Sequence, residues 1–145
     1  MRENARAAGT LCRVLAQDLM PLHWTIDSKE RLVIAVVDGE VTREEIQTYV
    51  DALVGAKALT YRKLFDASRG DTTMGPEEMM ALGAMFRGFH ARGEVGPLAI
   101  VVPDDKIELV SRVLGILAAA DRPMRVFRET EPARRWIESL PREQT

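Results

Sequence analysis

Hydrophobic and polar residues follow two periods along this chain, and the two periods alternate. Five segments have the length and apolar content of β-strands, and the sequence predicts them at residues 22–26, 32–37, 63–66, 97–102 and 124–127. Around them apolar residues recur every three or four positions, which predicts helices over residues 42–55, 76–92, 104–120 and 130–140. Strands that alternate with helices indicate an α/β fold in which right-handed crossovers join parallel strands.

The first two strands predict an exception to the parallel arrangement. Only the polar turn Asp27–Glu30 separates them, so the first strand is expected to lie antiparallel to the second at an edge of the sheet. The second strand is apolar throughout, which is typical of a strand covered on both faces. Thr42 and Glu45 have the spacing of a capping box, so the first crossover helix is expected to begin there. The sequence therefore predicts a single domain with a five-stranded, mostly parallel sheet.

Residues 1–20 predict one further helix ahead of this domain. Apolar residues recur there at helical spacing, at Ala8, Leu11, Cys12, Leu15 and Leu19. Pro21 ends the pattern, because proline cannot continue a helix. We therefore expect an amphipathic N-terminal helix over residues 1–20 and an α/β domain over residues 21–145.

Four segments in this order of elements carry a family resemblance. They are Val37–Thr42, Leu64–Asp66, Ala99–Asp104, and Val126–Arg128 followed by Ala133–Trp136. With the order of strands and helices, they resemble the SpoIIAA-like family of small bacterial proteins, over about Leu22 to Leu140. The resemblance implies a fold similar to STAS and Sec14-type domains. Most members of the family lack an assigned activity, whereas STAS domains act as anti-sigma-factor antagonists and Sec14 domains carry lipids, so these two functions enter as analogies.

Charge and composition exclude several partners. The chain of 145 residues has 20 Lys and Arg against 22 Asp and Glu, so no overall positive field attracts nucleic acid. No segment approaches the roughly 18 apolar residues that span a bilayer. The single Cys12 cannot form an internal disulfide, and His23 and His90 match no zinc spacing. We expect a cytoplasmic protein that does not span the membrane and uses no metal or other cofactor.

Polar residues at the carboxyl ends of the strands form a candidate ligand site. Ligands of open α/β sheets gather at this edge, which brings together Asp38, Asp66, Ser68, Arg69, Asp104 and Asp105. Their carboxylates could hold Mg²⁺ or transfer protons. Aspartates at strand ends are also ordinary turn and cap residues, and we favour that structural interpretation.

The loop before the second crossover helix is a candidate phosphorylation site. In STAS antagonists a serine or threonine in this loop is phosphorylated, and the resemblance places Thr72 nearest to it, followed by Thr73. A phosphate at the start of a helix would meet free amides and the positive end of the helix dipole. The inserted Met74 departs from the STAS pattern. The simpler interpretation is that both threonines cap the helix.

The second and third crossover helices have more apolar residues than one sheet face requires. The second contains Met79, Met80 and Phe86, and the apolar residues of the third cover about half of its surface. Mutual packing of the helices would explain this excess, as would a homodimer interface or a groove for an apolar small molecule, a lipid or a partner helix. On a helical projection Met80 lies apart from the stripe of Met79 and Phe86.

These patterns predict a non-catalytic binding or regulatory domain. The chain has strong signals for its fold but shows no arrangement that activates a nucleophile or holds a catalytic metal. The apolar helical face would serve dimerisation or bind a hydrophobic ligand. Two alternatives remain: a phosphorylation-regulated partner protein of the anti-sigma-factor-antagonist type, and a small enzyme that uses the strand-end carboxylates.

Overall fold

The structure is a computed structural model that describes residues 21–71, 75–91, 95–117 and 123–142. Its elements follow in the order β1 (Leu22–Asp27), β2 (Leu32–Glu40), α2 (Arg43–Gly55), β3 (Arg62–Asp71), α3 (Pro76–Ala91), β4 (Leu98–Val101), the short 3-10 helix η1 (Asp104–Lys106), α4 (Ile107–Leu117), β5 (Met124–Phe127) and α5 (Thr130–Ser139). The helix predicted over residues 1–20 lies outside the described residues.

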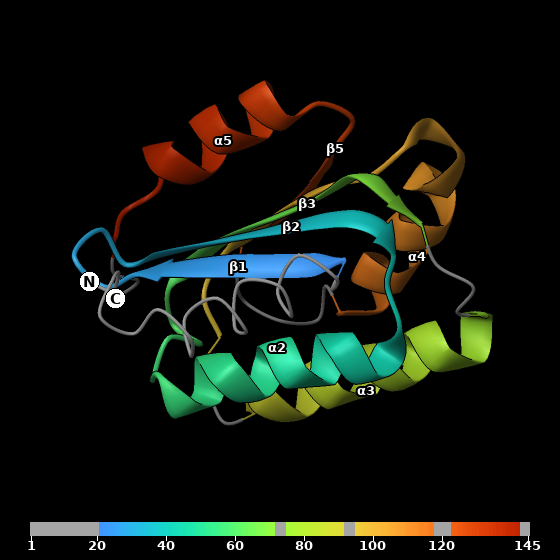
Figure 1. Ribbon diagram of the computed structural model, residues 1–145, viewed down its shortest axis with the longest axis horizontal. Helices are drawn as coiled ribbons and strands as arrows, with labels where there is room; N and C mark the ends of the chain where they lie inside the picture. The colour runs from blue at the N-terminus through green and yellow to red at the C-terminus, as the bar shows by residue number, and fades with distance from the viewer. Residues whose placement is uncertain (1–20, 72–74, 92–94, 118–122, 143–145) are drawn as a thin grey trace, which may run out of the picture.

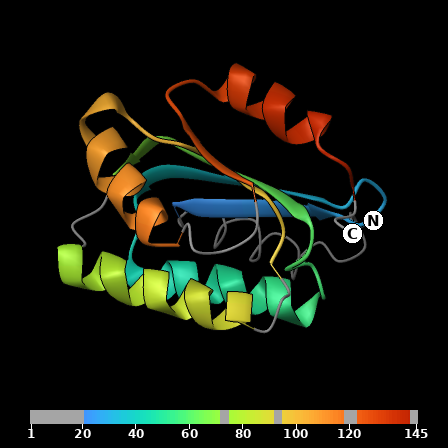
Figure 2. The same cartoon turned by 180° about the vertical axis from the view of Figure 1, so that it is seen from behind.

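The five strands form one sheet in the order β1-β2-β3-β4-β5. β1 runs antiparallel to β2, and β2 to β5 run parallel to one another. Helices cover both faces: α2 and α3 lie below the sheet in Figure 1, α5 lies above it, and α4 lies at one end. Figure 2 shows from behind that α4 approaches α3. These observations confirm the predicted α/β fold with a mostly parallel sheet and an antiparallel edge strand.

The neighbouring strands β2 and β3 are longer than predicted. The apolar pattern ends at Val37 in β2, yet the strand continues to Glu40, and β3 continues past Asp66 into a segment predicted as a loop. Parallel pairing resumes after a bulge and joins residues 38–40 to residues 69–71. Main-chain hydrogen bonds extend a strand whatever its side chains, so the hydrophobic pattern could not reveal this part.

The first crossover helix confirms its predicted cap. The Glu45 amide donates to the Thr42 hydroxyl oxygen over 3.2 Å, and the Thr42 amide donates to the Glu45 carboxylate over 2.8 Å. Tyr49, Val50 and Leu53 are buried. Val54 continues the apolar period of α2, which predicts an inward position, but this prediction is wrong because Val54 is 45% exposed.

Side chains alternate between two cores along the strands. On the side of α2 and α3, the core gathers around Leu22, Val33, Ala35, Val37, Val50 and Leu53. On the side of α5 it comprises Leu32, Leu64, Ala99, Val101, Ala133 and Ile137. The apolar period of the last helix predicts an inner face of Ala133, Trp136, Ile137 and Leu140, and it is confirmed because all four lie in or against this core.

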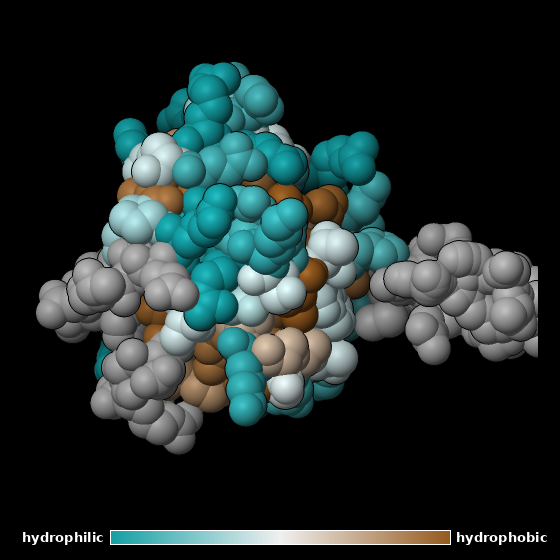
Figure 3. Space-filling model, turned by 90° about the vertical axis from the view of Figure 1, so that its left-hand side faces the viewer, coloured by the Kyte–Doolittle hydropathy of each residue, from teal (hydrophilic) through white to brown (hydrophobic). Residues whose placement is uncertain are grey.

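Thr130 stands at the start of the last predicted helix and is a residue type typical of a helix cap, but it does not cap α5. Glu129 occupies the N-cap position without a side-chain hydrogen bond, and the Thr130 hydroxyl instead donates to Asp66 of β3 over 2.8 Å. Hydrophilic side chains gather over the upper part of the molecule, where α5 lies (Figure 3). No helix in the described ranges has both the length and the apolar composition needed to cross a membrane.

Candidate functional site

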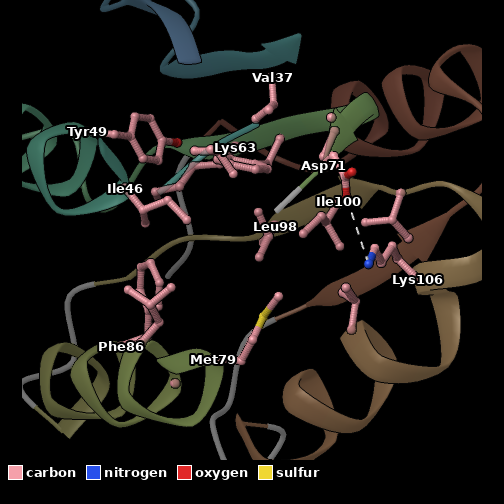
Figure 4. Close-up of a pocket in the computed structure, with 18 of the residues that line it drawn as sticks. Val37, Ile46, Tyr49, Lys63, Asp71, Met79, Phe86, Leu98, Ile100 and Lys106 are labelled. Atoms are coloured by element: carbon pink, nitrogen blue, oxygen red, sulfur yellow. Dashed lines mark ion pairs between the residues drawn. The ribbon is translucent and has the colours of Figure 1, made fainter. Parts of the chain in front are cut away.

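A cavity of about 190 Å³ lies between the sheet and the helices α2, α3 and α4. Its wall is almost entirely apolar (Figure 4). The lining residues are Val37, Val41, Ile46, Tyr49, Leu53, Lys63, Phe65, Ala67, Gly70, Asp71, Met79, Leu82, Gly83, Phe86, Val95, Leu98, Ile100, Val102, Pro103, Lys106 and Val110.

Strand alternation and helical period together build this wall. Leu98 and Ile100 occupy alternate positions of β4, so both face the helices. Met79 and Phe86 are seven positions apart on α3, which is two helical turns, and both face the sheet. Large side chains on both sides hold the helix and the sheet apart and leave the space between them.

A buried lysine also contributes to the wall. The Lys63 ammonium donates to the main-chain carbonyls of Leu59 and Tyr61, the latter over 2.8 Å. The lysine is therefore anchored to the loop between α2 and β3, while its side chain lies along the cavity. Burial of this charge is balanced by carbonyl dipoles of the same loop.

One end of the cavity carries an ion pair. Lys106 in η1 faces Asp71 at the end of β3, with 3.9 Å between Nζ and Oδ1 (Figure 4). The Lys106 side chain is 30% exposed, whereas that of Asp71 is 74% exposed. Both follow the carboxyl ends of strands, so the polar end of the cavity lies at the edge where α/β proteins hold ligands.

The three apolar residues of α3 that were predicted to bind a ligand do not all lie in the cavity wall. Met79 and Phe86 line the cavity, whereas Met80 is 44% exposed and is not part of the wall. The predicted separation of Met80 from the stripe of Met79 and Phe86 is therefore seen in the folded domain. Whether any of the three binds a ligand stays a prediction.

The strand-end residues have their own partners instead of facing the cavity. Asp66 accepts hydrogen bonds from the Ser68 amide over 3.0 Å and from its hydroxyl over 2.7 Å, besides the bond from Thr130. Asp38 pairs with Arg69 over 3.1 Å, and both side chains are exposed. Among the described residues, the cavity wall includes none of Asp38, Asp66, Ser68 and Arg69.

Asp104 belongs to a different ion pair, with Arg128 over 3.6 Å. Within the described ranges, no three His, Cys, Asp or Glu side chains lie together so as to hold a metal ion. Thr72 and Thr73 directly follow Asp71 and lie outside the described residues.

Comparison with models of protein families shows to which family the chain belongs. The family model described as SpoIIAA-like matches residues 32–138. The chain belongs to the SpoIIAA-like family. A similar solved structure is an uncharacterised protein of the DUF3478 family with a SpoIIAA-like fold from Shewanella loihica PV-4. It has 18% sequence identity and a TM-score of 0.55, and the match covers 82% of this chain and 95% of that chain. No curated protein matches the chain.

Sequence reasoning missed three polar residues of this SpoIIAA-like domain, namely Lys63, Asp71 and Lys106. The sequence pattern predicts Lys63 in a short strand, Asp71 in a loop and Lys106 inside a helix, and it gives none of the three a role. One signal was available for Lys63, because two consecutive cations directly before the apolar pair Leu64 and Phe65 are unusual at the start of a covered strand.

Proposed function

We propose that this SpoIIAA-like chain is a non-catalytic binding domain that holds a small apolar ligand in the cavity between the sheet and α2, α3 and α4. The observation that supports this proposal is a cavity of about 190 Å³ with an almost entirely apolar wall. An engineered apolar cavity of about 150 Å³ stays dry and binds benzene, so a cavity of this size and lining has room for a ligand. Pockets that bind small molecules have this character, with polar groups confined to one place.

The chemistry of the wall supports binding rather than catalysis. Aliphatic and aromatic side chains supply dispersion contacts and release water when a ligand enters, but they neither transfer protons nor attack a substrate. The Lys63 ammonium is committed to two main-chain carbonyls. Of the strand-end carboxylates of the enzymatic alternative, Asp38, Asp66 and Asp104 pair with other residues and are not part of the cavity wall.

Toluene tests the proposal as a minimal apolar probe. Its addition is expected to shift the NMR methyl signals of Leu98, Ile100 and Met79, which all line the cavity. Ala67→Leu adds three carbons to the wall and is expected to weaken toluene binding about tenfold or more, since it fills the space that the probe needs. Ala84→Leu is the matched control, because Ala84 is exposed on α3. Unchanged cavity methyl signals, or equal toluene affinity in both variants, would contradict the proposal.

Self-association or binding of a protein partner is a second candidate function. Met80 favours it, because an exposed methionine on a helix is an adaptable contact for another chain. Phosphorylation of Thr72 or Thr73 would be a separate mode of regulation and stays a prediction, as does a cytoplasmic location. Phosphopeptide mapping of the protein isolated from its host tests the phosphorylation, and an unmodified loop would count against it.

A further inference from the structure

The volume of the cavity limits the size of its ligand. An apolar cavity of about 150 Å³ accepts the six carbons of benzene, so about 190 Å³ holds a body of roughly six to eight carbons. A two-chain lipid is several times larger than this. The cavity as it stands therefore fits one short chain or one ring.

The charged residues that line the cavity differ in their partners and in their exposure to solvent. Three charged side chains are among its lining residues, Lys63, Asp71 and Lys106. Lys63 is anchored to main-chain carbonyls. The Asp71 side chain is largely exposed to solvent, whereas that of Lys106 is mostly buried. A ligand whose apolar part occupies the cavity would therefore place its polar group next to the Lys106 ammonium.

The ion pair at this end leaves Lys106 available for a stronger partner. The Nζ and Oδ1 atoms are 3.9 Å apart, which is too long for a hydrogen bond. A carboxylate placed directly against the ammonium would form a charge-assisted hydrogen bond of about 2.8 Å. Asp104, two residues before Lys106, is itself paired with Arg128, which reduces its repulsion of an incoming anion.

From this arrangement we infer that the cavity binds a short single-chain carboxylate, whose tail lies among the apolar residues and whose head pairs with Lys106. The inference rests on the proposed function, because it names the class of ligand for the same cavity. Asp71 is then a competitor for the Lys106 ammonium, and ligand binding turns its carboxylate towards solvent.

Three probes of one chain length separate the contributions of tail and head. Isothermal titration calorimetry at pH 7 would compare octanoate, octan-1-ol and octylamine on the full chain. Octanoate is expected to bind about tenfold more tightly than octan-1-ol, as one charge-assisted hydrogen bond predicts. Octylamine is expected to bind most weakly, because its ammonium meets Lys106.

Two substitutions locate the head. Lys106→Met keeps the length of the side chain and removes its charge, so it should abolish the preference for octanoate over octan-1-ol. Asp71→Asn removes the competitor and should tighten octanoate binding about threefold or more. Lys29→Met is the matched control, since Lys29 lies in the exposed β1–β2 turn, and it should leave all three affinities unchanged. If Lys106→Met fails to fold, Lys106→Gln replaces it in the same comparison.

The outcomes distinguish this inference from the proposed function. If octan-1-ol binds as tightly as octanoate and Lys106→Met changes neither affinity, the cavity takes neutral apolar ligands and only the present inference fails. If octylamine binds most tightly, Asp71 receives the head and the inference is likewise overturned. If none of the probes binds and toluene leaves the cavity methyl signals unchanged, the proposed function itself fails.

Discussion

The two faces of the sheet are covered in different ways. Among the described residues, the ten-residue helix α5 packs on one face, where its Ala133 and Ile137 are fully buried and a groove of mixed polar and apolar lining remains beside the β1–β2 turn. On the other face α2 and α3, with α4 at one end, leave a cavity of about 190 Å³. Small residues such as Ala99 and Ala133 let α5 approach closely, whereas large ones such as Phe65 and Phe86 hold the other helices off. The size of the contacting side chains, more than the amount of helix, therefore decides how closely the helices pack on each face of the sheet.

Two adjacent cations show the same contrast. Arg62 points to the α5 side, where its guanidinium donates to the carbonyls of Glu138 over 3.3 Å, Leu140 over 3.0 Å and Glu30 over 2.6 Å. It thereby ties the C-terminal end of α5 to the β1–β2 turn. Lys63 points to the cavity side, and its ammonium donates to the carbonyls of Leu59 and Tyr61 in the preceding loop. On the α5 face, the hydrogen bonds of Arg62 therefore join segments far apart in the sequence, whereas those of Lys63 join residues close to it in the sequence.

The largest effect on stability is expected from removing the long-range hydrogen bonds of Arg62. Arg62→Met is expected to lower the free energy of unfolding by about 3 kcal/mol, because several buried or half-buried carbonyls lose a charged donor. Urea denaturation measures the change. Arg135→Met, at an exposed position of α5, removes the same charge and should have little effect. Equal stability of the two variants would mean that Arg62 does not secure α5.

Identical enlargements on the two faces should have opposite effects. Ala133→Leu forces three carbons into a filled core and is expected to lower stability by about 2 kcal/mol. Ala67→Leu places the same carbons in the cavity and should leave stability unchanged or raise it by less than about 1 kcal/mol. Thermal unfolding of both variants makes the comparison. Similar losses in both would show that the cavity face is packed as tightly as the α5 face.

Much of this architecture could be predicted from the sequence. The capping box at Thr42, the apolar second strand and the inner face of α5 are local or periodic signals, and each reports one element on its own. The continuation of β3 to Asp71 could not be predicted, because its pairing with β2 depends on main-chain hydrogen bonds that leave no side-chain pattern.

The candidate site was only partly predictable. Periodicity identified Met79 and Phe86 as inward-facing, but the space between them and the sheet depends on how several elements meet. The strand-end residues were grouped by chain position alone. Successive side chains of β3 point to opposite faces of the sheet, so Ala67 faces the cavity whereas its neighbours Asp66 and Ser68 do not. Asp66 instead accepts hydrogen bonds from Ser68 and Thr130.

The hydrogen bonds of Lys63 should contribute less to the free energy of unfolding than those of Arg62. Lys63→Met keeps the apolar part of the side chain and removes two hydrogen bonds, so the expected loss is about 1 kcal/mol. Urea denaturation alongside Arg62→Met measures the difference. A loss as large as that of Arg62→Met would show that the loop between α2 and β3 is as essential to the fold as the anchoring of α5.

The smallest expected effect on stability concerns the outer surface of α3. Met80→Glu should change the free energy of unfolding by less than about 0.5 kcal/mol, because the side chain is 44% exposed and is not part of the cavity wall. If α3 forms a contact between copies, the same substitution should weaken it, since a carboxylate in an apolar interface is costly to desolvate. Sedimentation velocity over a range of concentrations measures the association. Phe86→Glu is the contrasting variant, because it places a charge in the cavity wall and should strongly destabilise the domain. A monomer at every concentration, with or without Met80→Glu, would leave the cavity as the functional feature of this face and exclude α3 as a dimer contact.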